Sequence, residues 1–552
     1  MTIGRPAGGG PGTPRPGESP SPRLSAQGML AAAGLVAAVT LAARAVGLVR
    51  WFVFSGSVGA TCVGEVYVTA NQVPNVLFEV AAGGALAAVA VPLVAGHLQR
   101  GDEDSADRTA SALLTWALTV LLPLAALVAV AAGPVTLWLL GTPDGCDPRA
   151  ALDAARLMLV LFAPQLVLYG VGIVLAGVLQ AHRRFLAAAL APLLSSVVVI
   201  AVYLLFGAAY DAGDPLVALP ARAVWLLAGG TTLGVAALSL PLLIPSARLG
   251  VRWRPTWRFP AGTGRRAGAL ALAGIAVVGA QQLTTVVVLL LANAATGVAA
   301  LTVWTYTQTA YLLPYAVLVV PLATVAFPRL TGARAEAVPV LRRALVLSVA
   351  VSVVAAAVLV GLRAHVGVGF LLLDVGADGA GRAALDALPT TLAALAPGLV
   401  GFALVAVCTR ALYALGSPAR AAAAACLGWA VAGLLPLLLV APGSDAARTL
   451  LLLAVGSSVG MTVAGVLLLV EVVRAWGPEV VQGVVRGGLA ALVGAGAGLA
   501  VVELVLPDPA VRWLDVLGGA VVAGVVVLAL AALGLRVLSP STWREIVERM
   551  RS

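Results

Sequence analysis

Fourteen apolar stretches, each long enough to cross a lipid bilayer, dominate this sequence of 552 residues. A hydrocarbon core of about 30 Å needs roughly 20 apolar residues per helical crossing. Because 61% of the residues are hydrophobic and 11% are charged, a soluble globular fold is excluded. The sequence predicts an all-α integral membrane protein with about 14 transmembrane helices. Their approximate cores are 29–51, 65–94, 109–132, 150–179, 186–208, 221–245, 267–293, 299–328, 340–362, 385–413, 421–441, 448–472, 484–506 and 514–538.

The basic residues are all arginines, and they indicate what the protein faces. There are 34 of them against 24 acidic residues, which gives a formal net charge of +10. A nucleic-acid-binding protein would gather such charge on a polar domain, whereas the mean hydropathy here is +1.03. We therefore exclude nucleic acid as a partner and expect the arginines to face anionic membrane lipids.

The positions of the arginines predict an orientation. With the N-terminus inside, 25 arginines fall in inner segments, 7 fall in outer segments, and Arg44 and Arg50 lie within the first span. The positive-inside rule then predicts a multi-pass protein of the plasma membrane with both termini in the cytoplasm.

Two short motifs each occur twice, six spans apart. APQLV at 163–167 recurs as APGLV at 396–400, and AVAVPLV at 88–94 recurs as TVAFPRL at 324–330. The offsets of 233 and 236 residues nearly agree. They predict two parallel six-helix lobes followed by two C-terminal helices, an arrangement typical of transporters whose substrate site lies between the lobes.

These observations divide the chain into segments. A Pro-, Gly- and Ser-rich start without a cleavage signature predicts a disordered cytoplasmic tail rather than a signal peptide, and Trp543 and Ile546 share one side of an amphipathic C-terminal helix. The predicted segments are the tail at 1–28, an N-lobe at 29–246, a basic cytoplasmic loop at 247–266, a C-lobe that begins within 267–441 and continues to 472, spans thirteen and fourteen within 484–538, and the amphipathic helix at 540–552.

The cysteines and histidines do not form a metal-binding pattern. Four cysteines show no CxxC, and the three histidines lie far from them and from one another, so we predict neither metal nor cofactor. Cys62 and Cys146 fall in outer loops of the same lobe, which leaves a disulfide possible.

Ionised side chains inside hydrocarbon are costly, so those that remain usually face a cavity or a partner. In the first span, Arg44 and Arg50 are separated by about 600° of helical rotation, which leaves their side chains roughly 120° apart. Gly47 between them permits a bend.

The second span carries a polar stripe. Asn71, Asn75 and Glu79 follow at intervals of four residues, with Gln72 beside them. Pro74 interrupts the helical hydrogen bonds here, which is tolerated at this depth only against protein or water.

Spans one and two run in opposite directions, so Glu79 is expected near the level of Arg44 and Glu65 near that of Arg50. Two interpretations remain open. The pairs either clamp the two spans together, or the guanidinium groups lie in a hydrated cleft and bind phosphate oxygens.

Spans seven and eight are also unusually polar. Gln281, Gln282 and Gln308 accompany a series of threonines and tyrosines. These groups either hydrogen-bond between helices or line a cavity shared with the second span.

The loop after span six, RLGVRWRPTWRFPAGTGRR at 248–266, interleaves six arginines with two tryptophans. This pattern favours a segment at the membrane interface that faces anionic lipid, with RNA binding as the weaker alternative.

Five longer motifs resemble the MurJ/MviN family, the lipid II flippases of peptidoglycan synthesis within the multidrug/oligosaccharidyl-lipid/polysaccharide exporter superfamily. They are ARAVGLVR at 43–50, QVPNVLFEVAAGGALAAVAVPLV at 72–94, LAGVLQAHRRF at 175–185, VPLATVAFPRLTG at 320–332 and APGLVGFALVAVCTRALYALGSP at 396–418. The resemblance implies a bacterial two-lobe transporter, with no enzymatic activity, that moves an undecaprenyl-diphosphate-linked saccharide to the outer leaflet by alternating access, in the setting of cell-wall biogenesis and cell shape.

The resemblance implies that Arg44 and Arg50 bind the diphosphate, and we expect Asn71, Asn75, Gln281, Gln282 and Gln308 to contact the sugar. Gln72 and Glu79 complete the predicted substrate-binding set. The chain departs from the family pattern where charged residues are usual, and its cavity should therefore be less cationic. The departing positions are Trp51, Phe78, Glu79, Gly83 and either Thr309 or Ala310.

The leading hypothesis is accordingly a lipid II flippase. The alternatives are a flippase for another polyprenyl-linked polysaccharide, a cation-coupled multidrug exporter that uses Glu79, and a non-transporting scaffold for cell-wall synthesis proteins. A membrane glycosyltransferase is disfavoured, because no connection is long enough for a catalytic domain.

Overall fold

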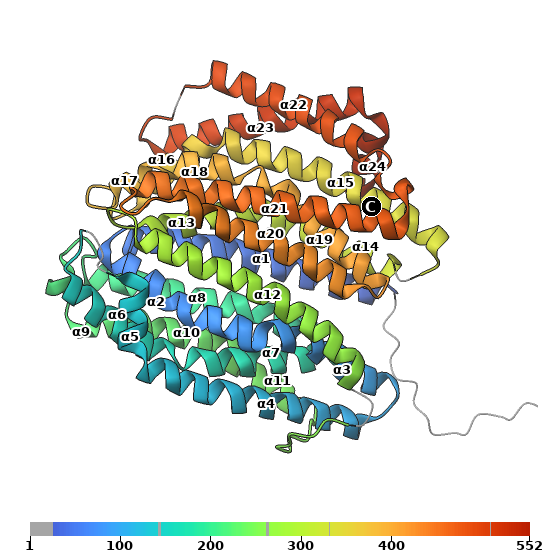
Figure 1. Cartoon of the computed structure of the whole chain (residues 1–552), viewed down its shortest axis with the longest axis horizontal. Helices are drawn as coiled ribbons and strands as arrows, with labels where there is room; N and C mark the ends of the chain where they lie inside the picture. The colour runs from blue at the N-terminus through green and yellow to red at the C-terminus, as the bar shows by residue number, and fades with distance from the viewer. Residues whose placement is uncertain (1–25, 142–144, 261–263, 331, 508, 552) are drawn as a thin grey trace, which may run out of the picture.

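The computed structural model describes the chain except for residues 1–25, 142–144, 261–263, 331, 508 and 552 (Figure 1). The predicted disordered tail lies almost entirely outside the described residues. Across the described residues the chain is helical, without a strand, and most of the long helices run roughly side by side. This arrangement satisfies the backbone hydrogen bonds within each segment, as a lipid environment requires.

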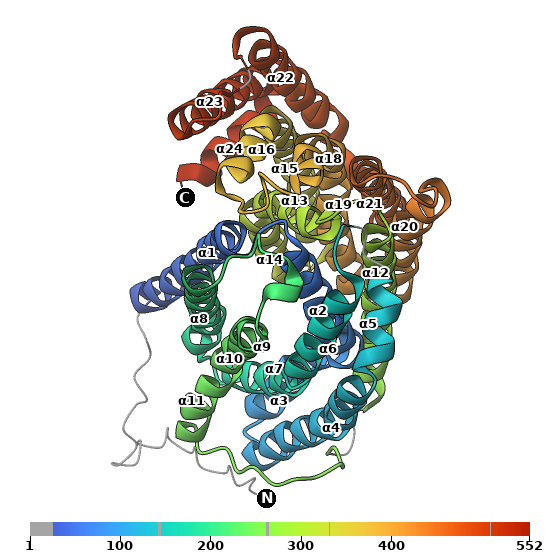
Figure 2. The same ribbon diagram turned by 90° about the vertical axis from the view of Figure 1, so that its left-hand side faces the viewer.

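The helices form two lobes and a C-terminal group (Figure 2). The N-lobe contains α1 (Ala26–Ser57), α2 (Cys62–Phe78), the π-helical η1 (Glu79–Gly83), α3 (Gly84–Gln99), α4 (Glu103–Val130), α5 (Ala132–Leu140), α6 (Pro148–Phe162), α7 (Gln165–Ala181), α8 (Phe185–Ala209), η2 (Leu216–Ala218), α9 (Ala221–Val224), η3 (Trp225–Gly229), α10 (Gly230–Ser239), η4 (Leu240–Leu242) and α11 (Leu243–Arg248).

The C-lobe contains α12 (Gly264–Asn293), α13 (Ala300–Pro314), the π-helical η5 (Tyr315–Val319), α14 (Val320–Leu330), α15 (Arg334–Gly361), α16 (Arg363–Leu373), α17 (Arg382–Asp386), α18 (Leu388–Leu395), α19 (Gly398–Ala414), α20 (Pro418–Leu439) and α21 (Ala446–Trp476). The C-terminal group contains η6 (Pro478–Val481), α22 (Val484–Val505), α23 (Trp513–Leu538) and α24 (Pro540–Arg551).

The number of spans is close to the predicted fourteen. Among the described residues, 12 helices are long and apolar enough to cross a membrane, and counting the bent pair α18 and α19 as one span gives 13. The predicted span at 65–94 corresponds to α2, η1 and α3, which are continuous but divided by the π-helical segment.

The internal repeat is visible as two pairs of matching helix irregularities. The APQLV motif lies where α6 gives way to α7, and APGLV lies where α18 gives way to α19. The π-helical segments η1 and η5 begin at Glu79 and Tyr315, which are 236 residues apart, the offset of the second sequence repeat. The two lobes therefore share the positions of their helix breaks as well as short sequence motifs.

Burial follows the pattern expected of a protein in lipid. Large apolar side chains on the perimeter of the bundle are exposed. Leu504 is 85% exposed and Leu514 is 86% exposed. The largest cluster of buried apolar residues joins both lobes at one end of the bundle and includes Phe54, Tyr306 and Leu388. This end, which holds the loops predicted to be outer, is referred to below as the outer end.

The region at 363–384, which showed no span in the sequence, forms the short apolar helix α16 and a loop that returns to the bundle. The predicted amphipathic helix forms as α24 and packs Trp543 and Ile546 against the buried cluster of α15 and α22.

Cys62 and Cys146 form a disulfide, with their Cα atoms 5.9 Å apart. It joins the start of α2 to the loop before α6 at the outer end, and so resolves the pairing that the sequence left open.

Replacing Cys62 or Cys146 with Ser should lower thermal stability, because the bond closes a separation of 84 residues and a crosslink of this length contributes about 4 kcal/mol through the unfolded state. Fluorescence-detected thermal unfolding of the purified protein would measure the shift. The partly buried free thiol of Cys426 offers a control, since Cys426→Ser should leave the midpoint nearly unchanged. Equal midpoints for all variants would contradict a stabilising role for the bond.

Candidate functional site

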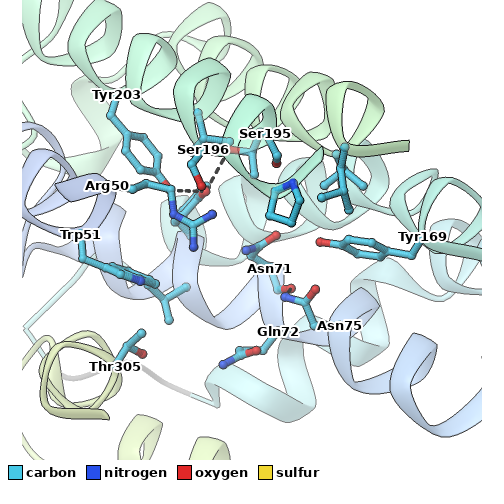
Figure 3. Close-up of a pocket in the computed structure, with 17 residues that line it drawn as sticks. Arg50, Trp51, Asn71, Gln72, Asn75, Tyr169, Ser195, Ser196, Tyr203 and Thr305 are labelled. Atoms are coloured by element: carbon cyan, nitrogen blue, oxygen red, sulfur yellow. Dashed lines mark hydrogen bonds between the residues drawn. The ribbon is translucent and has the colours of Figure 1, made fainter. Parts of the chain in front are cut away.

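A cavity of about 380 Å³ opens within the N-lobe and reaches the C-lobe at Thr305 (Figure 3). Helices α1, α2, α7, α8, α10 and α13 surround it. Its polar lining residues are Arg50, Tyr67, Asn71, Gln72, Asn75, Tyr169, Ser195, Ser196, Tyr203, Thr231 and Thr305. We call it the arginine cavity.

The polar stripe of α2 supplies one wall of this cavity. Tyr67, Asn71 and Asn75 stand four residues apart and face it together. Glu79 is the first residue of the π-helical η1 and does not line the cavity with them. The prediction of a polar face is confirmed for the first part of the stripe only.

Hydroxyl groups form a connected set at the buried end of the cavity. The Tyr67 hydroxyl lies 2.8 Å from that of Tyr203 and 2.9 Å from that of Thr231. Both tyrosines are buried. Because a hydroxyl can donate or accept by rotation, this set can adapt to an anionic or a neutral ligand.

Arg50 is the only charged side chain among the described residues that line the arginine cavity. Its guanidinium group lies 5.7 Å from the centre of the Trp51 ring, and within the described chain no carboxylate comes within 4 Å of it. A half-buried cation without a carboxylate partner makes the cavity electropositive.

Asn71 adds an unsatisfied acceptor. Its Oδ1 atom is buried and has no hydrogen-bond partner among the described residues, while the Asn75 side chain donates to the Asn71 carbonyl oxygen. Buried polar atoms of this kind are uncommon and call for a ligand or a water.

A second, smaller cavity of about 130 Å³ lies in the C-lobe. Gln281 and Gln308 line it together with the rings of Trp304, Phe402 and Trp429, and Gln72 of α2 lines both cavities. The buried hydroxyl of Tyr311 also faces it and has no partner among the described residues. We call it the amide cavity.

Three predicted site residues lie outside the lining of both cavities. Arg44 is exposed on α1, Glu79 is half-buried at the start of η1, and Gln282 is half-buried beside Gln281. The six others, Arg50, Asn71, Gln72, Asn75, Gln281 and Gln308, line one cavity or both.

The interpretation of two clamping ion pairs is wrong for the described conformation. Neither Arg44 with Glu79 nor Arg50 with Glu65 forms a salt bridge. Glu65 instead turns to the C-lobe, where it accepts hydrogen bonds from the N–H groups of Leu301 and Thr302, each at 3.1 Å, and from the Thr302 hydroxyl at 3.0 Å.

The physical reason is the free N-terminus of α13. The first N–H groups of a helix have no partner within it and attract negative charge. The residue before α13, Ala299, has no side chain that could cap them. A carboxylate from α2 fills that role, which no pattern within either helix could reveal.

A second buried carboxylate, Asp374, joins the lobes beside it. Its Oδ1 accepts from the N–H groups of Ala60 and Gly376 at 2.7 and 2.8 Å, and its Oδ2 accepts from the hydroxyls of Ser55 and Tyr306 at 2.7 and 2.9 Å. Burial raises the pKa of this carboxyl above its ordinary value, and the donors oppose the rise by stabilising the ionised form.

Asn293 provides a third polar contact at the same end. It accepts from Thr69 at 3.1 Å and donates to the Leu139 carbonyl at 2.9 Å, so α12 is fastened to α2 and α5. The lobes are thus held together at the outer end by hydrogen bonds as well as by apolar packing.

Sequence reasoning missed Tyr67, Tyr203, Thr231 and Asp374. Tyr67 lies four residues before Asn71, so extending the stripe by one step would have found it. The other three gain their significance only from contacts between distant segments, and no local pattern marks them.

The sequence and the fold were compared with known proteins. The family model described as lipid II flippase MurJ matches residues 54–513. A probable lipid II flippase MurJ of Rhizobium meliloti (strain 1021) is 26% identical over 294 residues, 53% of each chain, and one of Rhizobium tropici is 29% identical over 178 residues, 32% of this chain and 33% of that protein. The matches therefore span about a third to a half of these relatives.

Solved structures share the fold across nearly the whole chain. A lipid II flippase MurJ in an inward closed conformation has a TM-score of 0.70 and 17% identity, and the match covers 91% of this chain and 99% of that one. An inward-facing multidrug resistance transporter of the MATE family has a TM-score of 0.57 and 15% identity, covering 86% and 99%.

Replacing Asp374 with Ala should open the outer end, because the change leaves two hydroxyls and two N–H groups without their shared acceptor. Charged hydrogen bonds contribute about 1.5–3 kcal/mol each. We therefore expect the arginine cavity to become at least about tenfold more accessible from the outer side, measured as the rate at which a cysteine inside it is labelled. The reporter is Asn71→Cys, labelled by a membrane-impermeant thiol reagent supplied from the outer side and quantified by peptide mass spectrometry.

Asp378, exposed in the same loop, provides the matched control. Labelling of Asn71→Cys should stay at its basal rate when Asp378→Ala is introduced. A basal rate in the Asp374→Ala protein as well would show that the carboxylate does not hold this end closed.

Proposed function

The chain belongs to the lipid II flippase MurJ family, and from this premise we propose that it moves an undecaprenyl-diphosphate-linked peptidoglycan precursor from the inner to the outer leaflet of a bacterial plasma membrane. The diphosphate and sugars of such a lipid cannot cross hydrocarbon unaided, since each polar group would lose its hydrogen bonds to water. A polar cavity must replace that water while the polyprenyl tail remains in lipid.

The observation that carries the proposal is Arg50. Its guanidinium lies in the arginine cavity, where no carboxylate of the described residues comes within 4 Å. The hydroxyls of Tyr67 and Tyr203 line the same cavity, as does Asn71, whose Oδ1 has no partner in the described part of the chain. A guanidinium binds phosphate oxygens through two parallel N–H groups. We assign the diphosphate to Arg50 and its neighbouring hydroxyls.

The sugars are assigned to the amides. Gln72 lines both cavities, so we place it between the phosphate site and the amides of Gln281 and Gln308 in the C-lobe. The aromatic rings of the amide cavity suit the apolar faces of a pyranose ring, and Asn71 and Asn75 offer further polar contacts on the N-lobe side.

Arg44 is proposed to meet the diphosphate on entry. It lies six residues before Arg50 on α1, about 9 Å towards the predicted inner end, and its side chain is exposed. Glu79 and Gln282, which line neither cavity, are given no substrate contact in this conformation.

Transport is proposed to follow alternating access. The contacts of Glu65, Asp374 and Asn293 keep the outer end closed while the head group enters from the inner side, and their release exposes the site to the outer leaflet. This scheme places both termini in the cytoplasm, the arginine-rich inner segments against anionic lipid, and the outer loops where cell-wall synthesis proteins can reach them.

Arg50 also bears on the other transport hypotheses. An exporter of organic cations is disfavoured, because Arg50 would repel the cargo. A flippase for a different polyprenyl-linked glycan would use the same phosphate site, and the single lining arginine favours this second candidate over other functions. Transport assays with two polyprenyl-diphosphate lipids that carry different glycans distinguish a lipid II flippase from a flippase for another glycan.

Substituting Arg50 with Gln should reduce translocation of lipid II in reconstituted vesicles by at least about tenfold, since one charge-assisted contact contributes about 1.5–3 kcal/mol. Arg50→Lys should recover part of the rate. The control is Arg382→Gln, which alters an exposed outer residue paired with Asp386. Undiminished transport by Arg50→Gln would refute the assignment, and a wild-type chain that neither transports nor rescues a flippase-depleted strain would favour a scaffold.

Neighbouring glutamines offer a matched test of the sugar site. Gln281→Leu should slow transport by roughly two- to tenfold, the value of a neutral hydrogen bond, because Gln281 lines the amide cavity. Gln282→Leu should have little effect. The same vesicle assay measures both, and equal losses in the two variants would contradict the assigned sugar site.

A further inference from the structure

A second binding site is suggested by the loop that joins the two lobes. After α11 the chain runs without regular helix as far as Pro260, and it lies along α4 at the periphery of the N-lobe (Figures 1 and 2). We call residues 251–260 the strap. None of the residues lining the arginine cavity comes from the strap or from α4.

The strap is fastened in register to a row of polar side chains on α4. The N–H groups of Arg252, Arg254 and Thr256 donate in turn to Asp107 at 3.0 Å, Ser111 at 3.0 Å and Thr115 at 3.2 Å. Four helical residues rise about 6.0 Å and two extended residues about 6.6 Å, so every second strap residue meets every fourth residue of α4.

The two tryptophans complete the attachment. Trp257 Nε1 donates to the Thr119 hydroxyl at 3.1 Å, and Trp116 Nε1 donates to the Trp257 carbonyl oxygen at 3.0 Å. Trp253 packs against the buried cluster of the N-lobe. The strap is therefore a built part of the surface.

A groove of about 360 Å³ lies between the strap and α4. Its walls combine a leucine row with a single charged side chain, that of Arg254. The lining residues are Ser111, Leu114, Thr115, Leu118, Thr119, Leu122, Pro123, Trp253, Arg254 and Pro255.

The depth of the groove follows from the charge pattern of α4. Its first turns carry Glu103, Asp104, Asp107 and Arg108, whereas from Trp116 to Val130 the helix carries no charged residue. We therefore place Trp116 and Trp257 at the level of the lipid head groups, where tryptophan is enriched, with Leu118 and Leu122 on the hydrocarbon side of them.

The charges around the groove are complementary to an anion. Arg254 and Arg258 are exposed, and within the described chain neither has a carboxylate within 4 Å. The nearby acids are engaged elsewhere, since Asp107 accepts from the strap backbone and Asp104 lies 3.9 Å from Arg252.

We propose that this groove binds one anionic glycerophospholipid, with its phosphate on Arg254 and Arg258 and an acyl chain along Leu114, Leu118 and Leu122. An apolar row beside two guanidinium groups that have no carboxylate partner in the described part of the chain matches an amphiphile with a phosphate. The site deepens the proposed contact with anionic lipid, and it is independent of the cavity assigned to the transported precursor.

Photolabelling tests the site on the full chain. The protein is reconstituted in phosphatidylcholine vesicles that contain a minor fraction of phosphatidylglycerol with a diazirine in its acyl chain, and crosslinked peptides are mapped after irradiation. Label should concentrate on peptides containing 111–123 and 251–260. Arg254→Gln with Arg258→Gln should reduce this label by roughly fivefold per arginine, the value of a basic residue near an anionic membrane surface.

Two further variants keep the test decisive. Leu118→Trp should fill the groove and lower the labelling without altering charge. Arg248→Gln, at the last residue of α11, should leave the labelling unchanged. The proposal is overturned if the groove variants are labelled as strongly as the wild type. It is also overturned if a diazirine-bearing phosphatidylcholine labels the groove as strongly as the phosphatidylglycerol does. Crosslinking of the groove to a second copy of the chain in place of lipid also overturns it. No lipid II is present, so the result stands apart from the transport assays.

Discussion

Hydrocarbon offers polar groups no hydrogen-bond partners, and this constraint decides which side chains of the protein are structural. Glu65 and Asp374 are buried, and each accepts from several donors, two of them backbone N–H groups in either case. Arg50 is half-buried and has no carboxylate beside it among the described residues. A membrane protein keeps such a cation only where water or an anion can reach it. Glu65 and Asp374 therefore hold the lobes together, whereas Arg50 is available to bind a ligand.

The same constraint links the closed outer end to the cavities. Glu65 caps α13 from α2, and Tyr306 of α13 bonds to Asp374. One turn away from the Glu65 contact, Thr305 reaches the arginine cavity, and Gln308 lines the amide cavity. Helix α13 therefore carries both the closing contacts and part of the binding surface. A movement that releases the outer end must also shift the walls of both cavities, which is the coupling that alternating access requires.

Much of the fold could be predicted from the sequence because hydropathy and helix breakers are local signals. The spans, the two-lobe repeat and the amphipathic α24 follow from them, and the offset of 236 residues between the second pair of motifs equals the separation of η1 and η5. The site was predicted in part, since a stripe on α2 shows which residues share a face. The partners of Glu65, the role of Asp374 and the separation of Gln281 from Gln282 depend on how distant helices pack, and no spacing within one segment encodes that. The boundaries of the predicted segments stay a prediction.

The central claim is that Arg50 forms the phosphate site, and direct binding tests it without the complexity of transport. The affinity of the purified, detergent-solubilised protein for undecaprenyl diphosphate should be measured by a fluorescence or thermophoresis titration, for the wild type and for Arg50→Gln. The account predicts at least about tenfold weaker binding by the variant, because a charge-assisted contact to phosphate is lost. Equal affinity of the two proteins would contradict it.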